Sequence, residues 1–208
     1  MKNIFIIGCG LLGSSLLRAL VKKNISKKIF VYEKSKSNLN KIKKLKLSCE
    51  VVDDFKFAVT NSDLIILCTP MSEYKKIVLK MNKYLTAKNL ITDIGSSKLE
   101  SSKIVKKYLK KGANWLSSHP IAGSEVSGPE HGKADLFMDR WAILIKDKNS
   151  KLEHLKLLDN FWKKLGSKVA IMTSEKHDKI FSITSHLPHL IAYNLVKSAQ
   201  DFEKKQKY

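Results

Sequence analysis

Arginine is almost absent from this sequence, although the chain is strongly basic. Arg18 and Arg140 are the only arginines among 39 basic residues, and the formal net charge is +20. Base readout and bidentate phosphate contacts favour arginine, and here the lysines are scattered in pairs along the chain. This composition is typical of a lysine-biased surface and argues against a nucleic-acid partner. The positive field still suits small anionic molecules.

Long apolar runs and cysteine motifs are also missing. No apolar stretch approaches the ~18 residues of a membrane span, so no membrane partner is expected. The apolar start of the chain resembles a secretory signal, but too few residues precede Cys9 for one. Cys9, Cys49 and Cys68 are an odd number without motif spacing. We therefore expect reduced thiols in a cytoplasmic protein.

Strand patterns alternate with helical patterns through most of the chain. Strands are expected at residues 3–8, 28–33, 49–52, 63–69, 89–93, 113–117, 141–145 and 168–172. Helices are expected between them, at residues 11–23, 37–46, 73–84, 97–110 and 151–165. Near-continuous apolar strands that alternate with helices predict an α/β fold of the doubly wound Rossmann type, with a mainly parallel sheet covered on both faces.

The strand patterns stop after residue 172. We predict a dinucleotide-binding domain over residues 1–172 and, over residues 173–208, the first helix of an all-α domain, kinked at Pro188. One side of this helix is apolar, with Ile180, Ile183, Leu187, Leu190 and Ile191. The opposite side is uncharged and polar, with Ser182, Ser185, His186, His189 and Tyr193. In a chain so rich in lysine, an uncharged polar side is expected to line a site.

A glycine-rich loop, GCGLLG, follows the first predicted strand and opens a helix. Gly8 permits a tight turn, Gly10 lets the backbone approach a pyrophosphate, and Gly13 allows close packing of helix on strand. The start of the helix, at Leu11 and Leu12, offers unpaired N–H groups to phosphates. The loop therefore predicts a dinucleotide site.

Glu33 ends the second predicted strand, about twenty residues beyond the loop. A carboxylate at this position accepts the two ribose hydroxyls of NAD. It would repel the 2′-phosphate of NADP by on the order of 1–4 kcal/mol. We therefore predict NAD as the cofactor, while Lys34 and Lys36 keep NADP open as the less favoured alternative.

Four stretches of sequence, the first of which contains the glycine loop, form a wider pattern. They are GCGLLGSSLLRAL at 8–20, DLIILCTP at 63–70, TDIGSSK at 92–98 and SHPIAGSEVSGPEHG at 118–132. Together they resemble the prephenate and arogenate (cyclohexadienyl) dehydrogenases. The segment HDKIFSITSHLPHLIAYNLV at 177–196 is similar to that family's first helix after its nucleotide domain. The resemblance spans nearly the whole chain, and it places Thr69 and Pro70 at the cofactor.

The resemblance implies an enzyme of tyrosine biosynthesis. Its reaction is the NAD-dependent oxidative decarboxylation of prephenate to 4-hydroxyphenylpyruvate, in which hydride leaves C4 of the ring for NAD⁺ and the ring carboxylate leaves as CO₂. Arogenate, which would give tyrosine, is the alternative substrate. Two other functions stay open: a β-hydroxyacid-type dehydrogenase with a catalytic lysine, and a non-catalytic NAD-binding protein.

His119 is the predicted catalytic base. It lies just past a predicted strand, where Pro120 holds it extended, and an imidazole there can accept the proton of the substrate hydroxyl. The resemblance implies that Ser96 hydrogen-bonds the same hydroxyl. It also implies that His189 binds the substrate, with His186 in support.

Other polar residues near these have weaker assignments. Ser124 and Glu125, in the small-residue loop after His119, are expected to order the substrate pocket. Asp93 and Lys98 are as well explained by helix capping as by catalysis. No metal site is predicted, because His186-x-x-His189 lacks further ligands at suitable spacing.

The resembled family continues into further helices beyond the equivalent of Tyr208. That region carries an arginine for a substrate carboxylate and most of a dimer interface, and neither Arg18 nor Arg140 takes the arginine's place. We therefore expect a C-terminally truncated member of the family, either a fragment or a natural truncation. The apolar side of the last helix needs a cover, which predicts a homodimer through that helix.

Overall fold

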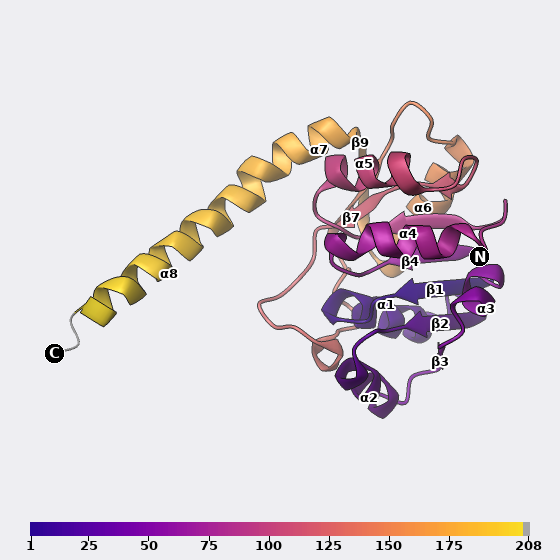
Figure 1. The fold of residues 1–208 in the computed structure, drawn as a ribbon, viewed down its shortest axis with the longest axis horizontal. Coiled ribbons are helices and arrows are strands. Elements are labelled where there is room, and N and C mark those ends of the chain that lie inside the picture. The colour runs from indigo at the N-terminus through magenta and orange to yellow at the C-terminus, as the bar shows by residue number, and fades with distance from the viewer. Residues whose placement is uncertain (206–208) are drawn as a thin grey trace.

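The computed structural model describes residues 1–205, which form an α/β domain and a long C-terminal helix (Figure 1). The main sheet has six parallel strands in the order β3-β2-β1-β4-β5-β6. These are β1 (Asn3–Ile7), β2 (Lys28–Tyr32), β3 (Glu50–Val51), β4 (Leu64–Leu67), β5 (Leu90–Asp93) and β6 (Asn114–Trp115). This is the strand order of a dinucleotide-binding Rossmann domain, so the predicted fold class is confirmed.

Helices cover both faces of this sheet. They are α1 (Leu11–Lys22), α2 (Lys36–Lys44), α3 (Phe55–Thr60), α4 (Tyr74–Asn82), α5 (Lys98–Tyr108) and α6 (Leu152–Leu165), with a short 3₁₀ turn η1 (Met71–Glu73) before α4. Alternate strand residues face opposite layers: Ile4 and Ile6 pack with α1 and α6, whereas Phe5 and Ile7 pack with α3 and α4. The six-residue α3 was not predicted, since it is too short to show a helical period.

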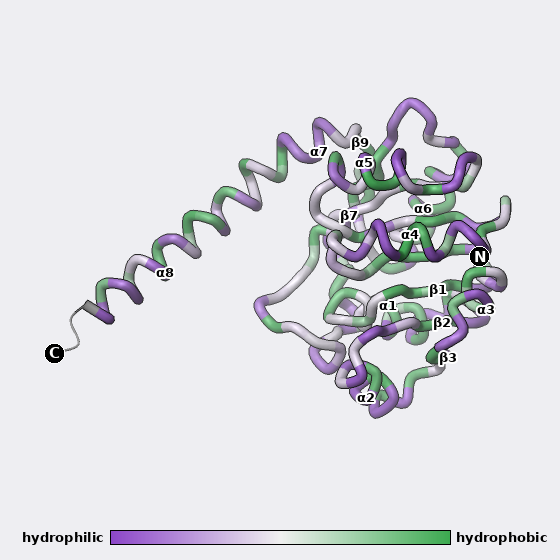
Figure 2. Tube along the Cα trace, viewed as in Figure 1, coloured by the Kyte–Doolittle hydropathy of each residue, from purple (hydrophilic) through white to green (hydrophobic). Residues whose placement is uncertain are grey.

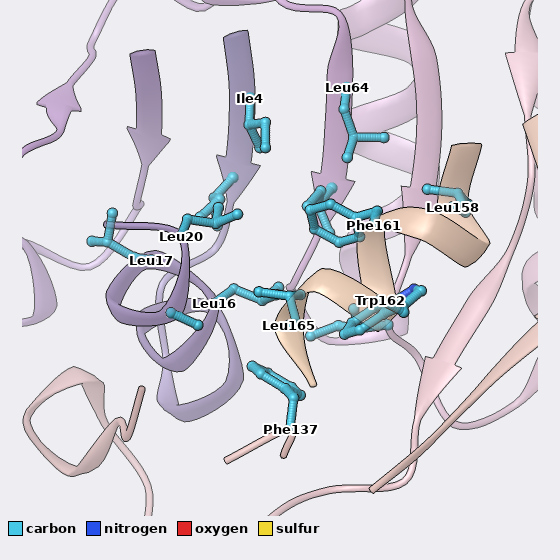
Figure 3. Packing of buried hydrophobic residues seen from close by; sticks show 14 of the residues in the cluster. Ile4, Leu16, Leu17, Leu20, Leu64, Phe137, Leu158, Phe161, Trp162 and Leu165 are labelled. Carbon is cyan, nitrogen blue, oxygen red and sulfur yellow. The ribbon is translucent and has the colours of Figure 1, made fainter. Parts of the chain in front are cut away.

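The larger core lies between the sheet, α1 and α6 (Figure 3). Trp162 and Phe137 are fully buried there, with their ring centroids 5.5 Å apart in an edge-to-face arrangement. Each such aromatic side chain contributes roughly 1.5–3 kcal/mol by leaving water. This packing fixes α1, and with it the glycine loop at the start of that helix.

A second sheet of three strands follows the first. It contains β7 (Ser118–Pro120), β8 (Trp141–Ile145) and β9 (Lys168–Met172), with β7 antiparallel to β8 and β8 parallel to β9. His119 does follow the strand predicted at 113–117, which is β6, but it also lies inside β7, opposite Ile143, and that strand was not predicted. The three-residue β7 has no recognisable strand pattern, and only its pairing with a distant segment makes it a strand.

The segment between β7 and β8 runs along the outside of the domain. It contains the 3₁₀ turn η2 (Pro129–His131), which packs against α1 and α2. The Ser15 hydroxyl accepts a hydrogen bond from the backbone N–H of Lys133 at 3.0 Å. The small residues 123–127 at the start of this segment are exposed.

The C-terminal part is helical, as α7 (Ser174–Phe181), the π-helical turn η3 (Ser182–His186) and α8 (Leu187–Lys205). The sequence predicted a kink at Pro188. The irregularity lies just before it, in η3, because a wider turn relieves the clash between a proline ring and the carbonyl four residues earlier. α8 extends away from the α/β domain (Figure 1), and apolar and polar stretches alternate along it (Figure 2). Within residues 1–205, no helix combines the length and apolarity needed to cross a membrane.

Candidate functional site

The glycine loop joins β1 to α1 at the carboxyl edge of the main sheet. Gly8 has φ +88, and a Cβ there would lie 2.6 Å from Cγ2 of Thr69 and 2.9 Å from the carbonyl oxygen of Cys68. A Cβ on Gly13 would overlap the carbonyl oxygen of Gly8. Gly10, in contrast, has no neighbouring atom within 4 Å of such a Cβ. The loop is therefore closely packed on the protein side and open in front of α1.

The start of α1 offers free hydrogen-bond donors to that open space. Gly10 is the N-cap residue and provides no side-chain acceptor for the first turn, which contains Leu11 and Leu12. The backbone N–H groups at such a helix start, and the positive end of the helix dipole, favour phosphate. Next to the loop, the Thr69 hydroxyl is buried and lacks a hydrogen-bond partner in the described part of the chain. Pro70, which follows it, is exposed.

Glu33 lies beside the glycine loop, just after β2. Its carboxylate accepts hydrogen bonds from the backbone N–H groups of Cys9 at 2.8 Å and of Ser35 at 2.9 Å. These two contacts fix the orientation of a half-buried carboxylate, whose remaining lone pairs can accept ribose hydroxyls. The loop, the start of α1 and Glu33 therefore fit NAD.

A buried polar cluster lies under the end of β5. The Lys98 ammonium is completely buried and donates to Asp93 Oδ2 at 2.7 Å, to Ser117 Oγ at 3.0 Å and to the carbonyl oxygen of Ser118 at 2.9 Å. Asp93 also accepts from the Tyr74 hydroxyl at 3.1 Å and from Ser117. Burial lowers the pKa of Lys98, while Asp93 opposes that shift. Asp93 and Lys98 thus form an ion pair in the protein interior, and side-chain helix capping does not account for them.

His119 lies next to this cluster and belongs to a line of hydrogen-bonded side chains. Its Nδ1 is 2.8 Å from Nε2 of His177, and Nδ1 of His177 is 2.7 Å from Oδ1 of Asp178. The Asp178 carboxylate also accepts the backbone N–H groups of Lys98 at 2.8 Å and of Leu99 at 2.9 Å, in the first turn of α5. The start of α7 is thereby joined to both β7 and α5.

Burial determines the protonation of the two histidines. Burial and, after it, the positive charge of Lys98 lower the pKa of His119 to about 3. Burial also lowers the pKa of His177, which the hydrogen bond to Asp178 partly offsets. The Phe181 ring packs edge-on against His119, with centroids 5.4 Å apart. His119 is therefore a neutral imidazole at pH 7 and can accept a proton.

The other predicted substrate residues are not hydrogen-bonded to His119. Ser96 is exposed in the turn between β5 and α5, and Ser124 and Glu125 are exposed in the segment after β7. His186 and His189 are exposed on η3 and α8. His186 is close enough to His119 to contribute to the lowering of its pKa. The substrate-binding roles of these five residues stay predictions.

Sequence reasoning missed three residues of the site, His177, Asp178 and Phe181. All three lie in the segment that supports the family resemblance, yet no role was given to them. The only available signal was an adjacent His-Asp pair at the start of a predicted helix. Only the packing of α7 against α5 brings the pair to His119.

Comparison with known proteins agrees with this geometry. Residues 16–171 match the family model described as prephenate dehydrogenase, nucleotide-binding domain, and residues 173–208 match prephenate dehydrogenase, dimerization domain. The chain belongs to the prephenate dehydrogenase family. It is 34% identical over 206 residues to the cyclohexadienyl dehydrogenase of Zymomonas mobilis, and the match covers 99% of this chain and 70% of that protein.

Other members of the prephenate dehydrogenase family show the same likeness. The Bacillus subtilis prephenate dehydrogenase is 28% identical over 205 residues, covering 98% of this chain and 55% of that protein. The crystal structure of prephenate dehydrogenase from Aquifex aeolicus superposes with a TM-score of 0.86 at 29% identity, covering 95% of this chain and 71% of that one. The chain therefore spans between about half and three quarters of the length of these relatives.

Proposed function

We propose that this chain catalyses the NAD-dependent oxidative decarboxylation of prephenate to 4-hydroxyphenylpyruvate. The observation that supports it most is His119, a partly buried neutral base in a chain of this family whose glycine loop and Glu33 fit NAD. A further A. aeolicus prephenate dehydrogenase structure, a complex with hydroxyphenyl propionate and NAD⁺, is 28% identical with a TM-score of 0.83.

In this reaction the protein has to orient the substrate and to hold and return the proton of the ring hydroxyl. When bound, NAD⁺ supplies the hydride acceptor. His119 accepts the proton of the ring hydroxyl as the hydrogen on C4 leaves as hydride. The ring carboxylate leaves as CO₂, and the electrons of the broken C–C bond complete the aromatic ring as a phenolate. His119 then returns its proton to that oxygen, which gives the phenol of 4-hydroxyphenylpyruvate. Base catalysis of this kind contributes roughly 10²–10⁴-fold to a rate.

Substrate binding in this proposal involves the exposed residues around His119. Ser96 hydrogen-bonds the substrate hydroxyl together with His119, while His189 binds the substrate with support from His186. Ser124 and Glu125 shape the pocket from the segment after β7. The exposure of all five side chains leaves them accessible to a ligand, and their match to the family's motifs supports the assignment.

The test is NADH formation on adding prephenate, and separately arogenate, to the chain with NAD⁺. We expect turnover of prephenate and a loss of at least about 100-fold in His119→Ala, with NAD⁺ affinity unchanged because His119 is not in the cofactor loop. Turnover of arogenate but not of prephenate would show that arogenate is the substrate. NAD⁺ binding without turnover of either compound would refute catalysis and leave a cofactor-binding protein.

We also propose that the protein is a homodimer that covers the apolar side of α8. Leu187, Leu190, Ile191, Leu195 and Phe202 are 48–66% exposed, and the segment matches a dimerization domain. Light scattering on a sizing column should give the dimer mass, and Leu195→Lys should shift it toward the monomer. The control Gln200→Lys, which adds the same charge on the opposite, exposed side of α8, should not. A monomeric wild-type protein at micromolar concentration would contradict the proposal.

A further inference from the structure

The three side chains His119, His177 and Asp178 form a continuous hydrogen-bonded line that spans both parts of the chain. His119 comes from β7, while His177 and Asp178 come from the first turns of α7. The two links measure 2.8 and 2.7 Å, both within ordinary hydrogen-bond distance. Neither family resemblance nor sequence pattern gave His177 or Asp178 a role.

The direction of each hydrogen bond follows from the end of the line. The Asp178 carboxylate is acceptor-only, and two backbone N–H groups of α5 already hold it in place. Nδ1 of His177 must therefore carry a hydrogen. In a neutral imidazole the other nitrogen is then an acceptor, so Nε2 of His177 accepts from Nδ1–H of His119. Nε2 of His119 is left without a hydrogen.

A protonated His177 would reverse the link to His119, because Nε2 of His177 would then donate and no longer accept. The surroundings oppose this, since His177 is completely buried and its pKa is lowered. The charged and titratable groups around the pair are Asp93 from β5, Lys98 from α5, Asp178 from α7 and His186 from η3. Lys98 lowers the pKa of both histidines, so both rings stay neutral at pH 7.

We infer that His177 and Asp178 are positioning residues that hold His119 in the tautomer whose Nε2 is the free base. Nε2 of His119 has no hydrogen-bond partner among residues 1–205, and it is not one of the buried unpartnered atoms, so it is open to solvent and to a ligand. Nδ1–H stays on His119 throughout. As Nε2 takes the hydroxyl proton, the new positive charge is stabilised through His177 by the Asp178 carboxylate.

The hydrogen-bonded line also couples the α/β domain to the C-terminal helical segment. Moving α7 relative to β7 and α5 would break the line and free the ring of His119 to turn or to change tautomer. The role of His119 as base rests on the proposed function, but its tautomer does not. The first experiment is therefore one that needs no substrate.

Long-range ¹H–¹⁵N NMR on the full chain distinguishes the protonated from the unprotonated ring nitrogen of each histidine. At pH 7 we expect His119 and His177 both as the Nδ1–H form, and in His177→Phe we expect His119 to populate both tautomers. His119 carrying its hydrogen on Nε2 in the wild type would overturn the inference. This result stands whether or not the chain turns over prephenate.

Kinetics then separate positioning from simple loss of structure. His177→Phe keeps the ring shape but removes the acceptor, and we expect kcat to fall about 10- to 100-fold with little change in the KM for NAD⁺. His177→Gln, whose amide oxygen can accept from His119, should recover part of the loss. His154→Gln is the control, because His154 is a partly buried histidine of α6 outside the site. Equal kcat values for the Phe and Gln variants, or a loss that follows melting temperature only, would refute the role.

Discussion

The glycines of the loop between β1 and α1 differ in what a side chain would meet. At Gly13 the obstacle is the backbone carbonyl of Gly8, which cannot rotate away. At Gly10 the space is empty and φ is −73, outside the left-handed region that favours glycine. Gly13 is therefore required by the packing of the fold, whereas Gly10 is required only if a ligand approaches.

Two alanine substitutions separate these roles. Gly13→Ala should lower the free energy of unfolding by about 1–3 kcal/mol, because the added methyl overlaps backbone. Gly10→Ala should leave that free energy within about 0.5 kcal/mol of wild type yet weaken NAD⁺ binding. Urea unfolding and calorimetric titration with NAD⁺ measure the two effects. Unchanged NAD⁺ affinity in Gly10→Ala would show that the cofactor does not occupy this space.

Glu33 should determine which dinucleotide is bound. Glu33→Gln removes the charge but keeps an oxygen for the N–H of Cys9. We expect NAD⁺ affinity to fall about tenfold and NADP⁺ affinity to rise, since a near repulsion on the order of 1–4 kcal/mol disappears. Titration of both cofactors measures this, with the exposed Glu50→Gln of β3 as the control. If the affinities for NAD⁺ and NADP⁺ changed in the same direction by the same factor, Glu33 would not distinguish the 2′-hydroxyl from the 2′-phosphate.

At the scale of elements, the ion pair of Lys98 and Asp93 joins α5 to the end of β5 and to the strand that carries His119. All three ammonium hydrogens of Lys98 are used, one of them on the backbone carbonyl of Ser118. The first turn of α5 in turn holds Asp178 of α7. Four elements, β5, α5, β7 and α7, therefore meet around one buried cluster.

Removing the lysine should be costly because it leaves Asp93 buried without its partner. We expect Lys98→Met to lower the free energy of unfolding by about 3–5 kcal/mol. Lys103→Met, on the same helix, removes an exposed pair with Glu100 and should change it by less than about 1 kcal/mol. Urea denaturation measures the free energy of unfolding of both variants. A double variant, Lys98→Met with Asp93→Asn, should recover part of the stability, and failure to do so would locate the loss in packing.

For the whole molecule, two neutral histidines, the partly buried His119 and the buried His177, make stability depend on pH. His119 has its pKa lowered to about 3 and that of His177 is lowered as well, both chiefly by burial. In the unfolded chain a histidine has a pKa of about 6.5. Between about pH 6.5 and the folded values, the unfolded state therefore binds protons that the folded state does not. Stability is complete above this window and falls as the pH drops through it.

The loss should reach up to about 1.4 kcal/mol per pH unit for each fully shifted histidine. Urea midpoints at pH 7 and pH 5 measure it, and His119→Gln should reduce the difference between them. His131→Gln, which changes an exposed histidine of η2, should not. A wild-type protein equally stable at both pH values would show that His119 is protonated in the folded state.

Local patterns were sufficient for the Rossmann fold, the glycine loop and Glu33. These features depend on residues close together in sequence: a strand, a turn and the start of a helix. The patterns were insufficient for α3 and β7, which are too short to carry a period, and for the second sheet, which forms when β7 pairs with β8 more than twenty residues away. His177 and Asp178 were not predicted as neighbours of His119 because they, too, are distant from it in sequence.

The sequence by itself determined the order of elements, the cofactor loop and the identity of His119 as the candidate base, because each depends on local conformation and a recognisable run of residues. Only the tertiary structure decided that His119 lies within a strand, that Lys98 pairs with Asp93 in the interior, and that His177 and Asp178 form a hydrogen-bonded line with His119. Those facts depend on contacts across up to 80 positions of the chain, and hydrogen-bond direction there follows from which donors and acceptors the fold brings together.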